Sequence, residues 1–127
     1  MRFEHFALNV PDVRAQAAWY IQHVGFAAAR VRTEPPYTHF LADDSGRVVF
    51  ELYSNPAAPC LDFRSSDPLV FHFAVVSRDA AADADRLQQA GATVARDETL
   101  GDGSRLIMLR DPWGVCLQLC QRTTPMP

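Results

Sequence analysis

The chain has 127 residues, of which 48% are hydrophobic, and a formal net charge of −3. This length suits a single domain, and the interspersed acids and bases leave no basic stripe for nucleic acid. All twelve basic residues are Arg, which excludes chemistry that needs a lysine nucleophile. No apolar run approaches the roughly 20 residues that span a bilayer, no signal-peptide pattern opens the chain, and the three cysteines lack CxxC spacing. We therefore expect a soluble, cytoplasmic protein with no nucleic-acid or membrane partner.

The first half of the chain predicts the element order βαβββ. Alternation over residues 3–10 indicates a strand with His5 on one face and Phe6 on the other. Asp12 is suited to cap a helix, apolar residues recur at helical spacing after it, and Gly25 supplies a stop after about three turns. Three further strands are expected over residues 26–32, 37–42 and 47–53.

The second half repeats the first. The octapeptide HFALNVPD at residues 5–12 returns 67 positions later as HFAVVSRD at residues 72–79. The same element order follows, with a strand over LVFHFAVV and a helix between Asp79 and Gly91. The remaining strands are expected over residues 93–98, 104–109 and 115–120. We expect one domain over residues 1–127, made of module 1–55 and module 69–122 joined by the Pro- and Ser-rich linker 56–68.

Four polar residues interrupt strands that are otherwise apolar, and the repeat pairs them. His5 corresponds to His72 in the first strand of each module, and Glu51 corresponds to Gln118 in the fourth. A single strand histidine is most often a structural residue, but agreement at four matched positions favours a shared role, because a pseudo-two-fold axis brings equivalent side chains together. Two imidazoles, a carboxylate and an amide oxygen suit a divalent ion such as Zn, Ni, Co, Fe or Mn, with a position open for substrate.

These residues lie in motifs that resemble a known family. FEHFALNVPD followed by AWYIQHVGF is similar to the opening strand and helix of the vicinal oxygen chelate superfamily, also called the glyoxalase, bleomycin-resistance and dioxygenase superfamily. RLIMLRDPWGVCLQL is similar to its closing hairpin, so the resemblance covers nearly the whole chain. It implies an α+β fold of two βαβββ modules that form a curved, half-open mixed β-barrel around a metal cavity, and a homodimer whose cavity could be built within one chain or across two. The implied metal ligands are His5, Glu51, His72 and Gln118.

Gln118 departs from the pattern of the family's glyoxalase I enzymes, which place there a Glu that is implicated in moving the substrate proton. Gln can bind a metal through its amide oxygen but cannot act as a base. The methylmalonyl-CoA epimerases of the superfamily use two His, one Gln and one Glu, and this chain resembles them with the two halves exchanged. One carboxylate leaves a divalent site at a formal +1, which favours an anionic ligand. Glu51 is then the expected catalytic residue, as metal ligand, proton acceptor or both.

The resemblance implies a metal-dependent lyase or isomerase that acts on a small oxygenated substrate. The reaction would be proton abstraction next to a carbonyl, with the metal ion stabilising an enediolate-like oxyanion, and lactoylglutathione lyase is the nearest named activity. The main alternative is a bleomycin-resistance type protein that sequesters a drug without catalysis and dispenses with the metal ligands. Fosfomycin-type thiol transfer is disfavoured because it relies on a Glu where Gln118 stands, and extradiol dioxygenases usually have longer chains.

Arg105 is a candidate for holding a substrate carboxylate. If the DPWG loop closes a hairpin in which Arg110 pairs with Val115, then Ile107 lies beside Gln118. The same register places Arg105 on the face that carries Gln118. A solvated surface Arg is the ordinary alternative.

Two aromatic residues are expected to line the pocket wall. Tyr53 and Phe3 alternate with the predicted ligands and therefore share their faces of the strands. His39 is expected on the face opposite Glu51 and is left out of the site.

Overall fold

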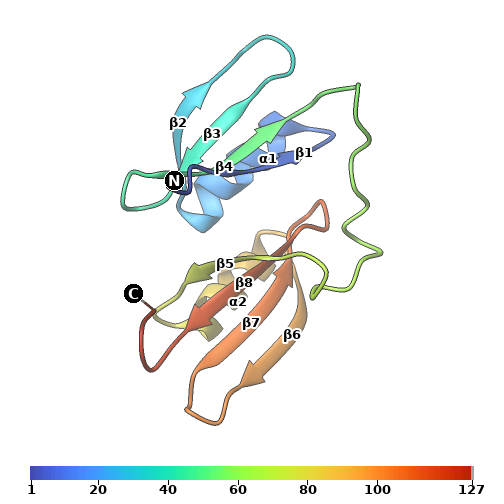
Figure 1. Cartoon of the computed structure of the whole chain (residues 1–127). Coiled ribbons are helices and arrows are strands. Elements are labelled where there is room, and N and C mark those ends of the chain that lie inside the picture. The colour runs from blue at the N-terminus through green and yellow to red at the C-terminus, as the bar shows by residue number, and fades with distance from the viewer. Residues whose placement is uncertain (127) are drawn as a thin grey trace. The chain divides into compact units, whose positions relative to one another are not determined.

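Each half of the chain folds into a four-stranded mixed sheet with a helix on one face (Figure 1). We describe residues 1–126 from a computed structural model. The chain divides into two compact units, Met1–Leu61 and a second that starts at Asp62. The predicted α+β class and the two βαβββ modules are confirmed, and the boundary between the units falls within the predicted linker 56–68.

The first module orders its strands β1-β4-β3-β2, with β1 parallel to β4 and the other neighbours antiparallel. Asp12 caps its helix by accepting a hydrogen bond from the backbone N–H of Ala15, as the sequence indicates. Its elements are β1 (Phe6–Asn9), α1 (Val13–Trp19), η1 (Tyr20–Val24), β2 (Ala27–Val31), β3 (His39–Ala42) and β4 (Val48–Tyr53).

The predicted regular α-helix of this module instead ends in the π-helical turn η1. The backbone N–H of Gly25 bonds the carbonyl of Tyr20 at 3.1 Å, one residue further along than in an α-helix. Gly25 has a φ of 93°, so it ends the helix in the left-handed conformation that glycine tolerates.

A buried tyrosine joins the helical segment to the sheet of the first module. The ring of Tyr20 is fully buried and lies 5.3 Å from the ring of Phe50 on β4. Leu52 and Leu41 are also fully buried. Because neighbouring residues of a strand face opposite ways, Glu51 lies on the face of the sheet that the helix does not cover.

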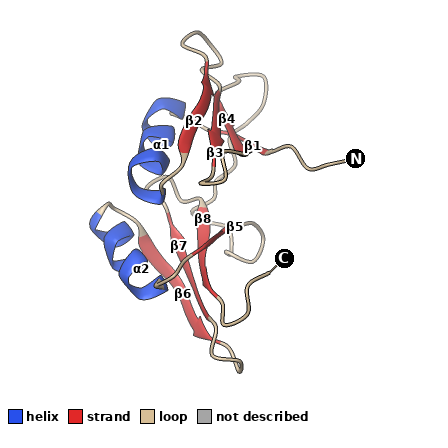
Figure 2. Cartoon of the chain, turned by 90° about the vertical axis from the view of Figure 1, so that its left-hand side faces the viewer, coloured by secondary structure: helices blue, strands red, loops and turns tan. Residues whose placement is uncertain are grey.

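The second module orders its strands β5-β8-β7-β6 and shows the same mixture of one parallel and two antiparallel pairings. Asp79 caps its helix and the buried Leu87 packs in its core, together with Leu109 and Leu117. Its elements are β5 (Phe73–Val76), α2 (Ala80–Gln89), β6 (Thr93–Thr99), β7 (Arg105–Arg110) and β8 (Cys116–Gln121). Figure 2 shows the helix of each module, in blue, beside the sheet of that module.

The prediction of a strand over LVFHFAVV is wrong in its first half. Residues 67–70 form a turn in which the backbone N–H of Val70 bonds the carbonyl of Asp67, and Leu69 and Val70 are exposed. The turn uses the hydrogen-bonding groups that a strand would need, so β5 begins only at Phe73. His72 therefore stands directly before its strand, as His5 stands directly before β1.

The repeat seen in the sequence is also a repeat of strand register. Ala7 pairs with Glu51 between β1 and β4, and Ala74 pairs with Gln118 between β5 and β8. Each of these residues is 67 positions from its equivalent. The two modules thus place an imidazole and a polar fourth-strand residue in the same backbone positions.

None of the helices in the described part of the chain has the length and apolar character needed to cross a membrane.

Candidate functional site

His5 and Glu51 lie side by side on the sheet face of the first module that the helix leaves open. His5 Nε2 lies 3.2 Å from Glu51 Oε2, and the two side chains are 24% and 20% exposed. The parallel pairing of β1 with β4 brings them together, because it sets Glu51 opposite Ala7 and His5 lies two residues earlier on the same face. The strand predicted over residues 3–10 begins only at Phe6, so His5 precedes it, and the contact with Glu51 shows which face the His5 side chain takes.

The second ring nitrogen of His5 also has a carboxylate partner. His5 Nδ1 lies 2.9 Å from Glu4 Oε1, although the Glu4 side chain is 80% exposed. The imidazole further makes an edge contact with the ring of Phe40, at 5.5 Å between centroids. Carboxylates that bind the outer nitrogen of a histidine fix the ring orientation and raise its basicity as a metal ligand.

His72 is oriented by a different kind of group. Its Nδ1 lies 3.0 Å from the backbone carbonyl oxygen of Pro68, in the turn that precedes β5. A carbonyl oxygen can only accept a hydrogen bond, so Nδ1 is the donor. The neutral ring then keeps the lone pair of Nε2 for another partner.

Gln118 lies buried on β8, next to a thiol. Cys120 Sγ donates to Gln118 Oε1 at 3.3 Å, and both residues lie on the same face of the strand. Burial raises the pKa of the Cys120 thiol, which keeps it protonated and able to donate. The amide oxygen of Gln118 has a second lone pair beyond the one that this bond uses.

The donors of the first module fit a divalent metal ion. Two ligands of a tetrahedral ion with bonds of about 2.0 Å stand roughly 3.3 Å apart, close to the separation of His5 Nε2 and Glu51 Oε2. Within residues 1–126, no three His, Cys, Asp or Glu side chains gather into a metal-binding group. An ion at this place would find two ligands in His5 and Glu51 and would need further donors.

The register predicted for the closing hairpin is wrong by one residue. Arg110 pairs with Cys116 rather than Val115, so Met108 lies opposite Gln118, where Ile107 was expected. Arg105 pairs with Gln121, on the face opposite Gln118. The DPWG turn includes one residue more than the sequence interpretation assumed, since the last pair closes around residues 111–115.

The environment of Arg105 agrees with this correction. Its guanidinium makes two hydrogen bonds to the carboxylate of Asp97 on β6, at 3.0 and 2.7 Å. Gln121, its strand partner, accepts a hydrogen bond from the N–H of Ala80 at the start of α2, so this is the face that the helix covers. The predicted contact of Arg105 with a substrate carboxylate depended on the wrong register and has no support from the observed one.

The other predicted residues differ in burial. Tyr53 is half-buried on β4, on the same face as Glu51, while Phe3 is 60% exposed and precedes β1. His39 pairs with Leu52, which confirms its predicted position on the face opposite Glu51.

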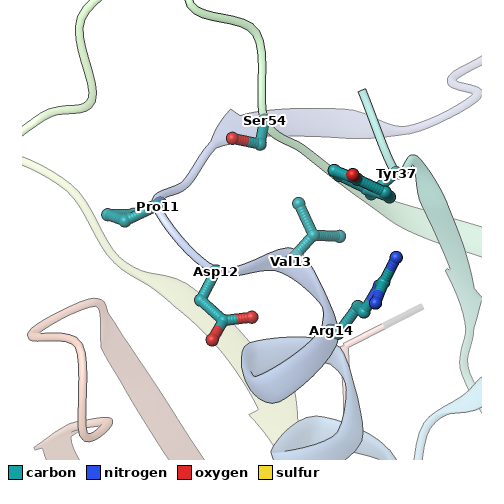
Figure 3. Close-up of a pocket in the computed structure, with 6 residues that line it drawn as sticks. All are labelled: Pro11, Asp12, Val13, Arg14, Tyr37 and Ser54. Atoms are coloured by element: carbon teal, nitrogen blue, oxygen red, sulfur yellow. The ribbon is translucent and has the colours of Figure 1, made fainter. Parts of the chain in front are cut away.

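A small hollow of about 240 Å³ lies beside the start of α1, and sequence reasoning did not find it (Figure 3). The guanidinium of Arg14 stacks over the ring of Tyr37 at 4.5 Å on one side of it. Tyr37 has a φ of 59°, which no sequence signal indicated. The hollow is lined by Pro11, Asp12, Val13, Arg14, Tyr37 and Ser54.

Sequence reasoning missed the residues that orient the predicted ligands. Glu4 precedes His5 in the sequence, so its adjacency was a usable signal. Cys120 shares a strand face with Gln118 and could have been found by alternation. The carbonyl of Pro68 could not, because every residue has a carbonyl and only the fold selects one.

Two βαβββ modules with a histidine before the first strand and a polar residue in the fourth define a class of paired-module α+β proteins. Residues 2–119 match the family described as the Glyoxalase/Bleomycin resistance protein/Dioxygenase superfamily, and the chain belongs to this superfamily. Among curated proteins none matches the chain.

Solved structures share the fold at low sequence identity. TnmS3, an antibiotic binding protein from Streptomyces sp. CB03234, aligns with a TM-score of 0.73 and 22% identity over 97% of each chain. A glyoxalase I mutant from Zea mays aligns with a TM-score of 0.75 and 23% identity, over 97% of this chain and 45% of the maize chain. UcmS2 aligns with a TM-score of 0.75 and 20% identity, over 96% of this chain and 98% of its own. The similarity therefore extends to both catalytic and binding members of the superfamily.

Proposed function

We propose that the protein is a metal-dependent lyase or isomerase that acts on a small oxygenated substrate. The proposed ligands of the divalent ion are His5, Glu51, His72 and Gln118. The observation that carries the proposal is the pair of His5 Nε2 and Glu51 Oε2, which are 3.2 Å apart on an open sheet face. The Glu51 carboxylate is only 20% exposed, and it lies on the face of the sheet that the helix does not cover. A largely buried carboxylate needs a partner, so it is well suited to bind a ligand.

Glu51 is the proposed catalytic residue because it is the only carboxylate among the four ligands. A bound divalent ion would supply electrostatic stabilisation of negative charge on the substrate oxygen. Glu51 accepts the proton from the carbon next to the substrate carbonyl, and its place on β4 beside His5 sets where the carboxylate lies. Gln118 cannot take over this role, since an amide is not a base at neutral pH.

The proposed substrate is an anionic molecule. The charge of one divalent ion and one carboxylate leaves a formal +1, because both imidazoles and the amide are neutral. Tyr53, half-buried on the face that carries Glu51, is proposed to contact the apolar part of the substrate. Phe3 is retained as a candidate for the same role, although its side chain is largely exposed.

Metal analysis of protein purified without chelator is the first test. We expect about one divalent ion per chain, and we expect added Zn²⁺ or Ni²⁺ to raise the melting temperature of the chelator-treated protein, because a ligand that binds only the folded state stabilises it. A His5→Gln variant is the control and should lose most of that increase. If the wild type contains no ion and no metal raises its melting temperature, the enzyme proposal fails.

The second candidate is a binding protein that sequesters a small molecule without turnover. It is favoured by the similarity to TnmS3 over nearly the whole of both chains and by the absence of a base at position 118. Titration with a panel of aromatic antibiotics, followed by calorimetry, distinguishes the two. Binding that is unchanged in chelator-treated protein and in the Glu51→Gln variant would favour the binder over the enzyme.

A further inference from the structure

The nitrogen that His72 offers to a ligand depends on one backbone carbonyl. The bond from Nδ1 to the Pro68 oxygen, at 3.0 Å, holds the proton on Nδ1. A neutral imidazole in this tautomer has an unprotonated Nε2, which is the form that binds a metal. Whatever holds the Pro68 carbonyl in place therefore also sets the tautomer of His72.

The segment that leads to Pro68 is tied to the β7–β8 hairpin by the guanidinium of Arg110. Its Nη1 donates to the carbonyl oxygens of Phe63 at 2.6 Å and Gly114 at 3.2 Å, and its Nη2 donates to the carbonyl oxygen of Ser66. Arg110 is the last residue of β7 and is only partly buried. Bonds from a charged donor are stronger than neutral ones, and a planar guanidinium can serve three acceptors at once.

Further contacts hold the same segment against the hairpin. Arg64 Nη2 donates to the carbonyl oxygen of Pro112, and the chain passes so close that a Cβ on Gly114 would overlap the Arg64 side chain. Phe63 is buried, with its ring 5.5 Å from that of Phe71. The segment before His72 is thus a packed part of the second module and not a free linker.

We propose that Arg110 is a positioning residue for His72, acting through residues 63–68 and the Pro68 carbonyl. This inference rests on the proposed function in that it takes His72 as a metal ligand. The first module has no equivalent, since β3 ends at Ala42 where β7 ends at Arg110, and His5 is oriented by Glu4 instead.

The tautomer of His72 can be read directly by long-range ¹H–¹⁵N correlation of the imidazole rings in the full chain. The measurement is made at pH 8, where imidazoles are neutral, on protein freed of metal by chelator. We expect wild-type His72 to be in the Nδ1–H form. In Arg110→Gln we expect a large fraction of His72 to change to the Nε2–H form. Arg110→Lys keeps the positive charge but loses the planar guanidinium, so we expect a smaller fraction of His72 to change.

The chain offers two controls. His39 Nδ1 also bonds a backbone carbonyl, that of Tyr37 at 2.7 Å, and its tautomer should be the same in every variant. Arg105 lies on the same strand as Arg110 but bonds Asp97. Arg105→Gln should therefore leave the tautomer of His72 unchanged. If His72 keeps the Nδ1–H form in whichever Arg110 variants fold, the proposal is overturned.

Metal affinity separates this proposal from the proposed function. If the wild type binds Zn²⁺, Arg110→Gln should bind it about 10- to 100-fold more weakly, as expected when the group that orients a ligand is lost. Equal Zn²⁺ affinity in the wild type and Arg110→Gln would contradict the positioning role of Arg110 but not the proposed function. If the wild type binds no metal, the proposed function fails, while the tautomer measurement still decides whether Arg110 orients His72.

Discussion

The two modules share strand register but differ in how they hold the side chains at equivalent positions. In the first, His5 lies between the carboxylates of Glu4 and Glu51. In the second, His72 bonds the carbonyl of Pro68 and Gln118 accepts from Cys120. The two modules therefore agree in where the backbone places these residues and differ in the groups that surround them.

The divergence is electrostatic. In the first module the imidazole lies beside two carboxylates, whereas in the second His72 bonds a backbone carbonyl and Gln118 bonds a thiol, both of them neutral groups. The polar fourth-strand residue of the first module is a carboxylate that can accept a proton, and that of the second is an amide that can only bind and orient. This asymmetry is what the following predictions test.

The largest expected effect is that of Glu51→Gln on turnover. Replacing the proposed base by an amide should lower kcat by roughly 10²- to 10⁴-fold, the usual contribution of a general base. The measurement is the rate of proton exchange or isomerisation of the substrate found by screening. Glu98→Gln, an exposed substitution on β6, should leave the rate unchanged. An active Glu51→Gln enzyme would show that the two modules do not divide the chemistry in this way.

Equivalent core substitutions in the two modules should destabilise the protein by similar amounts, although the polar residues of the modules differ. Leu52 and Leu119 occupy equivalent positions, 67 residues apart, and are 0% and 3% exposed. Replacing either by Ala should lower the free energy of unfolding by about 2–5 kcal/mol, because each leaves a cavity in a packed core. Urea denaturation measures both variants. A difference between them of more than about 2 kcal/mol would mean that the repeat does not extend to the packing of the cores.

Converting the second module toward the first should strengthen metal binding. Gln118→Glu gives the site a second carboxylate, so we expect the affinity for Zn²⁺ to rise by about tenfold, measured by competition with a chromogenic chelator. Gln121→Glu adds the same charge on the opposite face of β8 and is the control. A gain of the same size in both variants would point to general electrostatics rather than to Gln118 as a ligand.

Removing the outer carboxylate of His5 should have a smaller effect. Glu4→Gln should weaken Zn²⁺ binding by up to about tenfold, at the low end for orienting groups because Glu4 is 80% exposed. The same competition assay applies, with the exposed Glu34→Gln as a reference. No change in affinity would leave His5 oriented by its contacts with Glu51 and Phe40.

The smallest effect concerns the pair that Arg105 forms in the second module. The hydrogen bond from Arg105 lowers the pKa of Asp97, so the stabilisation is present above the unfolded pKa of about 3.8 and is lost as pH falls through the lower folded value. Both side chains are well exposed, so Asp97→Asn should cost less than about 1 kcal/mol at pH 7 and less still near pH 2. Thermal unfolding at the two pH values tests this. A larger loss at pH 2 than at pH 7 would contradict the assignment.

Much of the fold and part of the site could be predicted from the residues in order. Alternation predicted which face of its own strand His5 and Glu51 each take, and only the parallel pairing of β1 with β4 brings the two side chains into contact. The 67-residue offset of the repeat paired Gln118 with Glu51, and the strand register agrees, since Ala7 pairs with Glu51 as Ala74 pairs with Gln118. The face that each residue takes could be predicted from periodicity along a single segment, and the matched positions in the two modules from the constant offset of the repeat.

The sequence by itself determined the element order, the repeat and the matched positions of the four polar residues, because local patterns of apolar and polar side chains carry that information. Only the tertiary structure decided the β7–β8 register, which places Arg105 on the face opposite Gln118, where it bonds Asp97. It also decided that a turn precedes His72 and that β5 begins only at Phe73. It also decided which carbonyl orients His72. Backbone groups are the same in every residue, so the choice among them is made by packing and hydrogen bonding across the chain.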